Sequence, residues 1–435
     1  MSGEWNCGYY VSVIRPRADV QRPDVKVLKE GPCGSRRGTF CSPLLEMAGR
    51  ASLSFLGQED ISLSGDPQVT YFIEKYQGQT PFAYRVDKVI FDEAGVSFGS
   101  ENHRTIPKSG DLITGMTLYT AFPTPPAGVQ VLDSVGTLMF QYVELYIGTE
   151  LIERLYGEHI EMMYDLTIPK GKQPALTFLD GKNLTYSVPP QLAYTVPLPF
   201  STFKKGLPLC AFKEEVTIRI VWNPSTYFTV PPTLITTPFT AQLNIEYTYL
   251  SEKEIAYMRK PRFQIFEQVQ LNQFFAPYPL STVHCRLDFY NPTKELFFVL
   301  QQDSARGYDY SNTATAASLT GTIGTGDILN QLEFDFNTTT RIDPIVGTPQ
   351  FLRIIQPLEF HTRVPDRLFY MYSFSLDPEG GDPAGSVNLS RIQAQNLYLS
   401  MNPNPTNVNI RVYAVSYNFL ETSNNSAKVT FSNFF

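Results

Sequence analysis

Apolar and polar residues alternate along much of this 435-residue chain. The clearest runs are Glu215–Ile220, Ala241–Leu250 and Ile410–Val415, in which every second side chain is apolar. A period of two residues is typical of a β-strand that buries one face. Phe140–Ile147 is apolar more continuously, and it also predicts a strand. The pattern therefore predicts an all-β chain built from many short strands.

Two stretches favour helix instead. Leu151–Leu166 places Ile160, Met163 and Tyr164 at helical spacing, which predicts a short surface helix. Ser251–Glu254 has the residues of a capping box and opens a second short helix before a proline. Elsewhere 33 prolines and 28 glycines interrupt the chain, as expected for short strands joined by long loops.

The helix after Ser251 separates two β-rich halves and is typical of an interdomain connector. The second half opens with the strand pattern Ile265–Gln270, and the first includes Val69–Ile73, a run of β-branched and aromatic residues that predicts a strand. We therefore divide the chain into an N-terminal arm (1–46), a first domain (47–250), a helical linker (251–261) and a second domain (262–435).

The arm differs from the rest of the chain. Residues 1–46 carry more Lys and Arg than Asp and Glu, contain four prolines, and hold two short β-like runs, Tyr9–Ile14 and Val25–Leu28. Such a segment cannot bury a core of its own. It is either a tether to a neighbouring protein or a solvated tail, and the sequence favours neither.

Composition excludes several classes of protein. The net charge of −7 argues against a nucleic-acid-coating role, which requires a basic face. No apolar run approaches the roughly 18 residues of a membrane span, and the first ten residues lack a signal-peptide pattern. Five cysteines, an odd and uneven set, indicate free thiols rather than a secreted disulfide framework.

Two candidate chemical sites are weak. Gly95–Gly99 matches the G-x-S-x-G elbow with Ser97 as nucleophile and His103 nearby, but no helical pattern follows it, so we favour a chance match. His159 lies between two glutamates, but no second His follows at the i+4 spacing of a metal site. We therefore predict no catalytic residues, no metal site, no cofactor and no enzymatic activity.

Several short sequence motifs, taken in their order along the chain, resemble those of a known protein family. They are Met47-Ala48-Gly49, the run Asn291–Leu296, and above all Leu368–Ile392, which passes from an apolar strand through a Pro/Gly-rich turn to Ser390-Arg391-Ile392. This order resembles the major capsid proteins of the nucleocytoplasmic large DNA viruses, of the chlorella-virus and iridovirus type. The resemblance covers residues 47–435, and it marks 1–46 as an extension.

The resemblance implies an all-β fold of two tandem eight-stranded jelly rolls, with a few short helices and long loops. It implies a structural capsid protein whose pseudo-hexagonal homotrimers tile an icosahedral shell around an inner membrane and a DNA genome. The partners would be other copies, neighbouring capsomers and minor capsid proteins on the inner face, without direct contact to nucleic acid. The protein would belong to the virion capsid and assemble in the cytoplasm of the infected cell. A minor capsid paralogue and a lectin-like jelly-roll protein stay open as alternatives.

Four N-x-S/T sequons could accept N-linked glycans, at Asn183, Asn337, Asn388 and Asn424. Asn388 lies inside the family's own Asn-x-Ser-Arg pattern, so we interpret that sequon as chance. Asn183, in a predicted loop, is the best candidate of the remaining three.

Overall fold

The computed structural model describes residues 64–73, 78–185, 187–312, 326–403 and 406–431, together with residues 57, 58 and 60. The chain divides into two units, Met1–Gly78 and Gln79–Phe435, and the larger unit holds all of the strands described below. The predicted arm, residues 1–46, lies outside the described residues, so its boundary stays a prediction.

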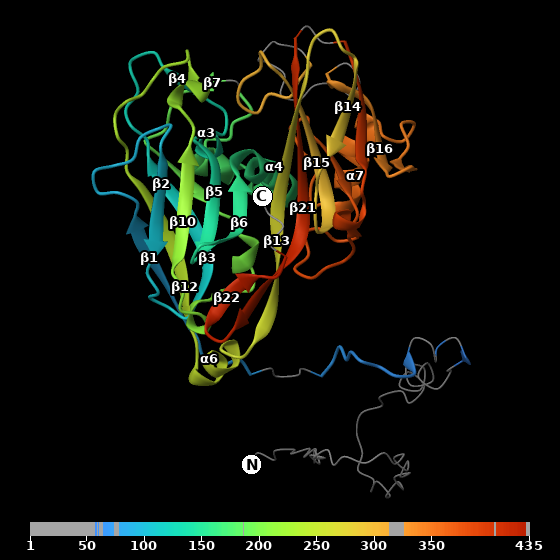
Figure 1. Cartoon of the computed structure of the whole chain (residues 1–435). Helices are drawn as coiled ribbons and strands as arrows, with labels where there is room; N and C mark the ends of the chain where they lie inside the picture. The colour runs from blue at the N-terminus through green and yellow to red at the C-terminus, as the bar shows by residue number, and fades with distance from the viewer. Residues whose placement is uncertain are drawn as a thin grey trace, which may run out of the picture. The chain divides into compact units, whose positions relative to one another are not determined.

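The first half of the larger unit folds into two four-stranded antiparallel sheets (Figure 1). If its eight main strands are numbered in chain order, one sheet has the order 1-8-3-6 and the other 2-7-4-5, which is the order of a jelly roll. The first sheet consists of β1 (Ala83–Ile90), β12 (Ala241–Tyr249), β3 (Leu112–Ala121) and β8 (Ala193–Pro197); the second consists of β2 (Glu101–Ile106), β10 (Val216–Trp222), β5 (Phe140–Ile147) and β6 (Glu150–Tyr156).

The second half repeats this order. Its sheets are β13-β21-β15-β18 and β14-β20-β16-β17, again 1-8-3-6 and 2-7-4-5. The prediction of two tandem jelly rolls is confirmed. The strands are β13 (Arg262–Ala276), β21 (Val408–Ser423), β15 (Pro292–Gln302), β18 (Tyr370–Ser373), β14 (Thr282–Leu287), β20 (Gln395–Met401), β16 (Leu329–Phe336) and β17 (Thr339–Ile342).

Several short strands are added to the eight main strands of each jelly roll or lie beside them. Each jelly roll adds a two-residue strand beside its third main strand, β9 (Leu207–Pro208) and β19 (Val387–Asn388), and β22 (Ser426–Val429) pairs with the end of β21. A third small sheet joins β4 (Gln130–Leu132), β7 (Ser187–Val188) and β11 (Thr229–Val230).

A helix follows the fifth main strand of each jelly roll. In the first it is α4 (Gly157–Thr167); in the second it is the π-helix Phe351–Ile355, continued by α7 (Gln356–Phe360). Two further short helices, α3 (Val135–Leu138) and α5 (Pro174–Leu179), lie in the first half. The linker helix α6 (Glu252–Met258) begins with the predicted capping box of Ser251 and Glu254.

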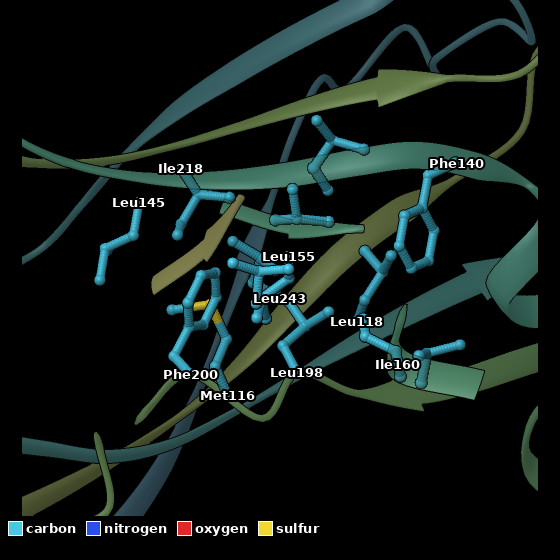
Figure 2. Close-up of a cluster of buried hydrophobic side chains, with 14 of the residues drawn as sticks. Met116, Leu118, Phe140, Leu145, Leu155, Ile160, Leu198, Phe200, Ile218 and Leu243 are labelled. Atoms are coloured by element: carbon cyan, nitrogen blue, oxygen red, sulfur yellow. The ribbon is translucent and has the colours of Figure 1, made fainter. Parts of the chain in front are cut away.

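The alternating runs bury one face each. In β10 and β12 the buried side chains include Ile218, Ile220 and Leu243, and the residues between them are only partly buried. Figure 2 shows part of this core, where Leu145 and Phe140 from β5 approach side chains of the opposite sheet such as Leu118 and Leu243. Burial of apolar area on this scale is the main source of stability.

Two predicted elements are wrong in part. Residues 69–73 form bends and extended chain, not a strand, because no described strand pairs with them; β-propensity is realised only against neighbours. The helix predicted over Leu151–Leu166 begins only at Gly157, since the preceding residues pair with β5 as β6. The helix is also buried rather than on the surface, because side chains of the second jelly roll such as Phe297 and Tyr413 pack on it.

Candidate functional site at the interface of the two jelly rolls

The central part of the sheet β13-β21-β15-β18 is buried on both faces. On one face Leu296, Phe298 and Ile410 belong to the core of the second jelly roll. On the other face Phe297 and Tyr413 belong to the same buried cluster as the core of the first jelly roll. The core of the first jelly roll therefore continues into the interface, while the second jelly roll keeps a separate core on the other face of its sheet.

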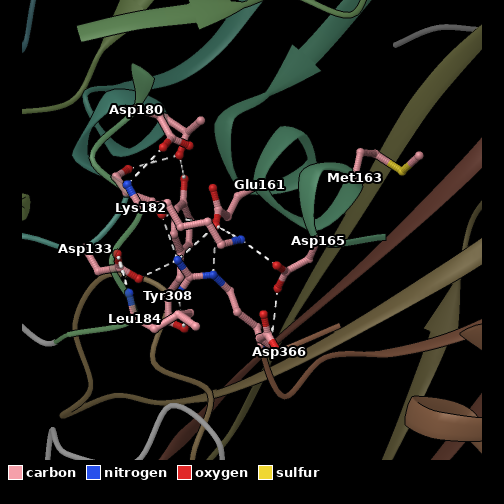
Figure 3. Close-up of polar contacts among 12 residues, drawn as sticks. Asp133, Glu161, Met163, Asp165, Asp180, Lys182, Leu184, Tyr308 and Asp366 are labelled. Carbon is pink, nitrogen blue, oxygen red and sulfur yellow. Dashed lines mark hydrogen bonds and ion pairs between the residues drawn. The ribbon is translucent and has the colours of Figure 1, made fainter. Parts of the chain in front are cut away.

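Polar side chains are embedded in this interface, and Arg367 is at the centre of the largest group. We call Asp133, Glu161, Asp165, Asp180, Lys182, Arg363 and Arg367 the Arg367 cluster (Figure 3). The guanidinium of Arg367, which precedes β18, donates to Asp133 Oδ2 at 2.7 Å, to Glu161 Oε1 at 3.0 Å and to Ser134 Oγ at 2.8 Å. The second jelly roll thus inserts a buried cation into a pocket of carboxylates that the first one supplies.

Lys182 and Arg363 complete the cluster. Lys182 Nζ lies 2.7 Å from Glu161 Oε1 and 2.5 Å from Asp165 Oδ1, and Arg363 Nη2 lies 2.6 Å from the same Asp165 oxygen. Burial acts to raise the pKa of Asp165, but the charges of Lys182 and Arg367 outweigh it and hold that pKa below its usual value. Asp165 is therefore a carboxylate at neutral pH.

Asp180 behaves in the opposite way. Burial and the nearby carboxylate of Glu161 raise the pKa of Asp180 well above its usual value. The Arg367 cluster contains four carboxyl groups and three cations, and the raised pKa of Asp180 lowers the negative charge that has to be buried. Charge balance is what makes burial of so many ionic groups tolerable.

A second group surrounds Glu158, the second residue of α4. Its carboxylate accepts hydrogen bonds from Arg411 at 2.6 and 2.7 Å, from Tyr413 at 2.5 Å and from Tyr310 at 2.8 Å. Burial acts to raise the pKa of Glu158, but the paired guanidinium outweighs it and lowers that pKa. These contacts fix the N-terminus of α4 against β21. A surface hollow of about 490 Å³ opens beside them.

A third group, the His361 cluster, consists of Lys294, Glu295, His361 and Glu379. His361 lies 3.1 Å from Glu295 Oε2 and 2.9 Å from Glu379 Oε1. Burial acts to lower the pKa of His361, but hydrogen bonds to both glutamates outweigh it and raise the pKa to about 9. His361 is therefore an imidazolium at neutral pH.

Glu153 of β6 provides a neutral contact across the interface. Burial raises its pKa to about 8, although the backbone amides of Ser201 and Thr202 donate to it. The hydroxyl of Ser201 in turn donates to the carbonyl oxygen of Glu267 on β13 at 3.1 Å. A protonated carboxyl thus links β6 to the edge strand of the second jelly roll.

His159, weighed above as a weak metal ligand, is buried between the rings of Phe297 and Tyr413. Burial lowers the pKa of His159 to about 4, so the imidazole is neutral and acts as a packing group. Among the described residues, no group of three or more His, Cys, Asp or Glu side chains is arranged to hold a metal ion.

The serine motif lies elsewhere. Ser97 is exposed in the loop between β1 and β2, and the chain after Gly99 enters the strand β2, on which His103 is also exposed. The elbow needs a helix at that point, so the strand–turn–helix context of a nucleophile is missing in this described segment.

The sequons occupy exposed positions. Asn183 is exposed in the loop after α5, and its backbone amide donates to Asp133. Asn337 caps a turn by accepting the amide of Ala394 at 3.0 Å. Asn424, at φ 53°, is the first central residue of the two-residue turn between β21 and β22. Their glycosylation stays a prediction.

Sequence patterns did not reveal the interface. Arg367 and Asp133 are 234 positions apart, and Arg411 and Glu158 are 253 apart. One usable signal was present: Glu161 and Asp165 follow each other at helical spacing on the face of α4 that also carries apolar residues. Charged residues on an apolar helix face indicate buried partners from elsewhere in the chain.

Comparison with known proteins decides the family. The model of the major capsid protein N-terminus matches residues 70–255, and that of the large eukaryotic DNA virus major capsid protein matches residues 254–428. The chain belongs to this major capsid protein family. The two matches follow each other in the expected order and confirm the resemblance seen in the sequence, while the bounds of the two domains stay a prediction.

Curated relatives of the family match over most of their length. A major capsid protein of Pyramimonas orientalis virus is 26% identical over 419 residues, covering 88% of this chain and 99% of the relative. A major capsid protein of Paramecium bursaria Chlorella virus 1 is 25% identical over 395 residues, covering 81% and 87%.

Solved structures of capsid proteins show the same fold. A quasi-atomic model of the PBCV-1 virus capsid superposes with a TM-score of 0.69 at 22% identity, covering 84% of this chain and 100% of that one. The Faustovirus major capsid protein gives a TM-score of 0.67 at 11% identity, covering 87% and 97%.

Membership of this family of structural capsid proteins confirms that the chain is not an enzyme. The buried clusters described above are therefore parts of a scaffold. None of the helices in the described parts of the chain is long and apolar enough to cross a membrane.

Proposed function

We propose that three copies of this chain form a homotrimeric capsomer with a pseudo-hexagonal outline, and that such capsomers tile an icosahedral shell around an inner membrane and a DNA genome. The observation that supports this most is the repeated strand order of the two jelly rolls, held together by buried ion pairs. Two similar barrels in each chain give six in a trimer, and a six-fold outline packs without gaps in a hexagonal lattice.

The rigidity of the interface suits this role. A lattice transmits stress between neighbours, so the two barrels of one chain must keep a fixed relation. Removing one partner of a buried ion pair costs several kcal/mol, and the Arg367 cluster alone contains three cations in such pairs. The barrels are therefore expected to act as one body during assembly.

The proposed partners are other copies, neighbouring capsomers and minor capsid proteins on the inner face. The net charge of −7 does not favour direct contact with the genome. The location would be the capsid of the virion, after assembly in the cytoplasm of the infected cell. Residues 1–46, with their positive excess, would fasten the capsomer to a neighbour.

Light scattering and negative-stain electron microscopy of the purified protein test the trimer. The expected mass is about 147 kDa, three times 49.1 kDa, and the expected image is a particle with a hexagonal outline. A protein that stays monomeric throughout the micromolar range would refute the proposal.

A minor capsid paralogue is the second candidate. One relative at 24% identity, from Acanthamoeba polyphaga mimivirus, is named a probable capsid protein 4 rather than a major one. Quantitative mass spectrometry of purified virions separates the two roles, because a major capsid protein must be the most abundant chain of the particle.

We also propose that Asn183 is the sequon that carries a glycan if any does, since its side chain is exposed in a loop. The intact mass of virion-derived protein should exceed that of the bare chain, and the excess should disappear in Asn183→Gln. A mass equal to that of the bare chain would end this proposal.

A further inference from the structure

Two adjoining hollows lie along the seam where the two jelly rolls meet. The strands β6 and β13 run side by side there (Figure 1), and the hollow of about 490 Å³ beside Glu158 opens next to them. A second hollow of about 440 Å³ adjoins it and shares Tyr156, Leu271, Gln273 and Phe274 as lining residues. We call the two hollows together the seam groove. Each volume lies within the range of small-molecule binding sites.

Part of the lining of the seam groove is one face of the second jelly roll's sheet. In the antiparallel pairing of β13 with β21, Gln273 lies opposite Arg411 and Phe275 lies opposite Asn409. Because side chains alternate between the two faces of a strand, these two pairs share one face. All four residues line the groove, and the ring of Phe275 is 54% exposed. This face therefore combines an exposed aromatic ring with two neutral amides and a guanidinium.

The first jelly roll supplies further polar and aromatic side chains. Gln141 of β5 and Tyr227, in the 3-10 helix Ser225–Tyr227 after β10, line the groove. Gln141 is exposed and Tyr227 is 45% exposed. Within the described parts of the chain, the side chains of Gln141, Tyr227 and Gln273 have no hydrogen-bond partner. Both jelly rolls thus present polar groups that are free to bind a ligand.

The charges that line the seam groove are balanced. Among the described residues around the first hollow, Glu158 is the one anion and Arg411 the one cation, and the two pair at 2.6 Å. The lining of the second hollow likewise contains one anion and one cation, Asp288 and Arg286. A phosphate or carboxylate ligand requires an excess of cations, and a cationic ligand requires an excess of anions. The lining therefore favours a neutral ligand.

Sugars combine the properties that this lining can recognise. Side-chain amides as a class, and the phenol of tyrosine, both donate and accept hydrogen bonds, as sugar hydroxyls do. The face of an aromatic ring is slightly negative and attracts the C–H groups on one face of a sugar ring. The exposed rings of Phe275 and Tyr227 provide such faces. The second hollow extends the site along β13 and gives room for more than one sugar unit.

We propose that the seam groove binds a neutral oligosaccharide, with Phe275 and Tyr227 as stacking surfaces and Gln141 and Gln273 as hydrogen-bond partners. The source of the oligosaccharide is either the surface of the host cell or a glycan carried by the virion. The site is formed within one chain, so the inference goes beyond the proposed capsomer and does not depend on it.

Binding of the full-length protein to a printed array of defined oligosaccharides tests the class of ligand. The wild type should bind neutral members, and this binding should persist at high ionic strength, because no net charge takes part. Binding to none of the members, or only to sulfated or carboxylated ones, would overturn the inference.

Substitutions at exposed positions of β13 test the site. Phe275→Ala should weaken binding of the best array ligand about tenfold, and Gln273→Leu should weaken it too, whereas Phe275→Tyr keeps the ring and should bind as the wild type does. Phe263→Ala is the matched control, because Phe263 is an aromatic residue of the same strand, is 64% exposed and lines neither hollow. Thermal unfolding should show that all four variants are folded. Unchanged affinity in both Phe275→Ala and Gln273→Leu, or an equal loss in Phe263→Ala, would show that the ligand binds elsewhere.

Two further measurements identify what occupies the groove. Glycans released from virions and glycans released from host cells are added separately as competitors, and the pool that displaces the array ligand identifies the source; failure of both pools would contradict the inference. Hydrogen exchange tests a protein occupant. If the amides of residues 271–275 are protected in the capsomer and no oligosaccharide binds, the groove is a protein interface and the inference is wrong. A monomeric protein that binds oligosaccharides would refute the trimer and leave this inference intact.

Discussion

Replacing Arg367 by Met tests whether the buried ion pairs hold the two jelly rolls together. The side chain of Arg367 is 1% exposed, and its guanidinium lies 2.7 Å from Asp133 and 2.9 Å from Glu161. Met has a similar length and removes the charge with every donor. The carboxylates of the first jelly roll then lose their cation from the second.

The loss of unfolding free energy depends on the hydrogen-bond donors that the carboxylates retain in the variant. Breaking a buried pair by removing one partner costs about 3–5 kcal/mol, because an uncompensated charge is left in a medium of low polarity. Asp133 keeps the backbone amides of Asn183 and Leu184 as donors, and Glu161 keeps Lys182. The loss should therefore be near the lower end, about 3 kcal/mol, which corresponds to a fall in Tm of roughly 4 °C for a folded body of this size.

Lys205→Met is the matched control. Lys205 also joins the two jelly rolls, and its Nζ lies 2.7 Å from Asp382 Oδ1, but the two side chains are 53% and 88% exposed. Solvent screens such a pair, so Tm should stay within about 2 °C of the wild type. Thermal unfolding at one protein concentration and one scan rate measures both variants. Equal shifts in the two variants, or no shift in Arg367→Met, would refute the claim that burial gives the cluster its strength.

Further predictions concern pH, packing and the arm. Because the pKa of His361 rises from 6.5 to about 9 on folding, its stabilisation is complete below pH 6.5 and is lost as pH rises through 9; His361→Gln should flatten that part of the Tm–pH curve. Because the pKa of His159 falls to about 4, stability is lost between pH 6.5 and 4, and His159→Phe should lose less; identical acid limbs would contradict this. A Cβ on Gly157 would lie 2.3 Å from a backbone oxygen of α3, whereas one on Gly171 meets nothing within 4 Å; Gly157→Ala should therefore lower the unfolding free energy by about 1–3 kcal/mol and Gly171→Ala should not. A chain that begins at Met47 should still fold and form trimers but assemble particles poorly; an unfolded or monomeric product would place the arm within the body, and normal particle yield would make it a simple tail.

The strand frame could be predicted because each strand carries its own periodic signal. In β10 and β12 every inward position is apolar, as with Ile218 and Leu243, so burial can be read locally. The capping box at Ser251 is equally local, since both partners lie within four residues. The prediction from local patterns failed where one pattern ran across the boundary between two elements. This happened at Gly157, where β6 passes directly into α4.

The interface could not be predicted for the opposite reason. Glu153 lies within an apolar strand. Nothing nearby in the sequence shows that the backbone amides of residues 201 and 202 will donate hydrogen bonds to its carboxyl group. Likewise His159 has the sequence of a candidate ligand, and only the rings contributed by β15 and β21 turn it into a neutral packing group. Such outcomes depend on which surfaces the fold brings together, and no single stretch encodes them.

The Arg367 cluster also makes folding of the first jelly roll depend on how far synthesis of the chain has advanced. The ribosome completes the first jelly roll, with four carboxyl groups and Lys182 in this cluster, well before it adds Arg363; Asp165, the carboxylate of the first jelly roll that Arg363 binds, is 198 positions earlier. Until then the acidic side of α4 is short of two cations and remains hydrated. We therefore expect that nascent chains arrested before residue 363 expose α4 to protease, and that release of residues beyond 367 from the exit tunnel protects it. The first jelly roll of an incomplete chain therefore cannot finish folding without the second. This dependence keeps it from joining a shell before its chain is complete.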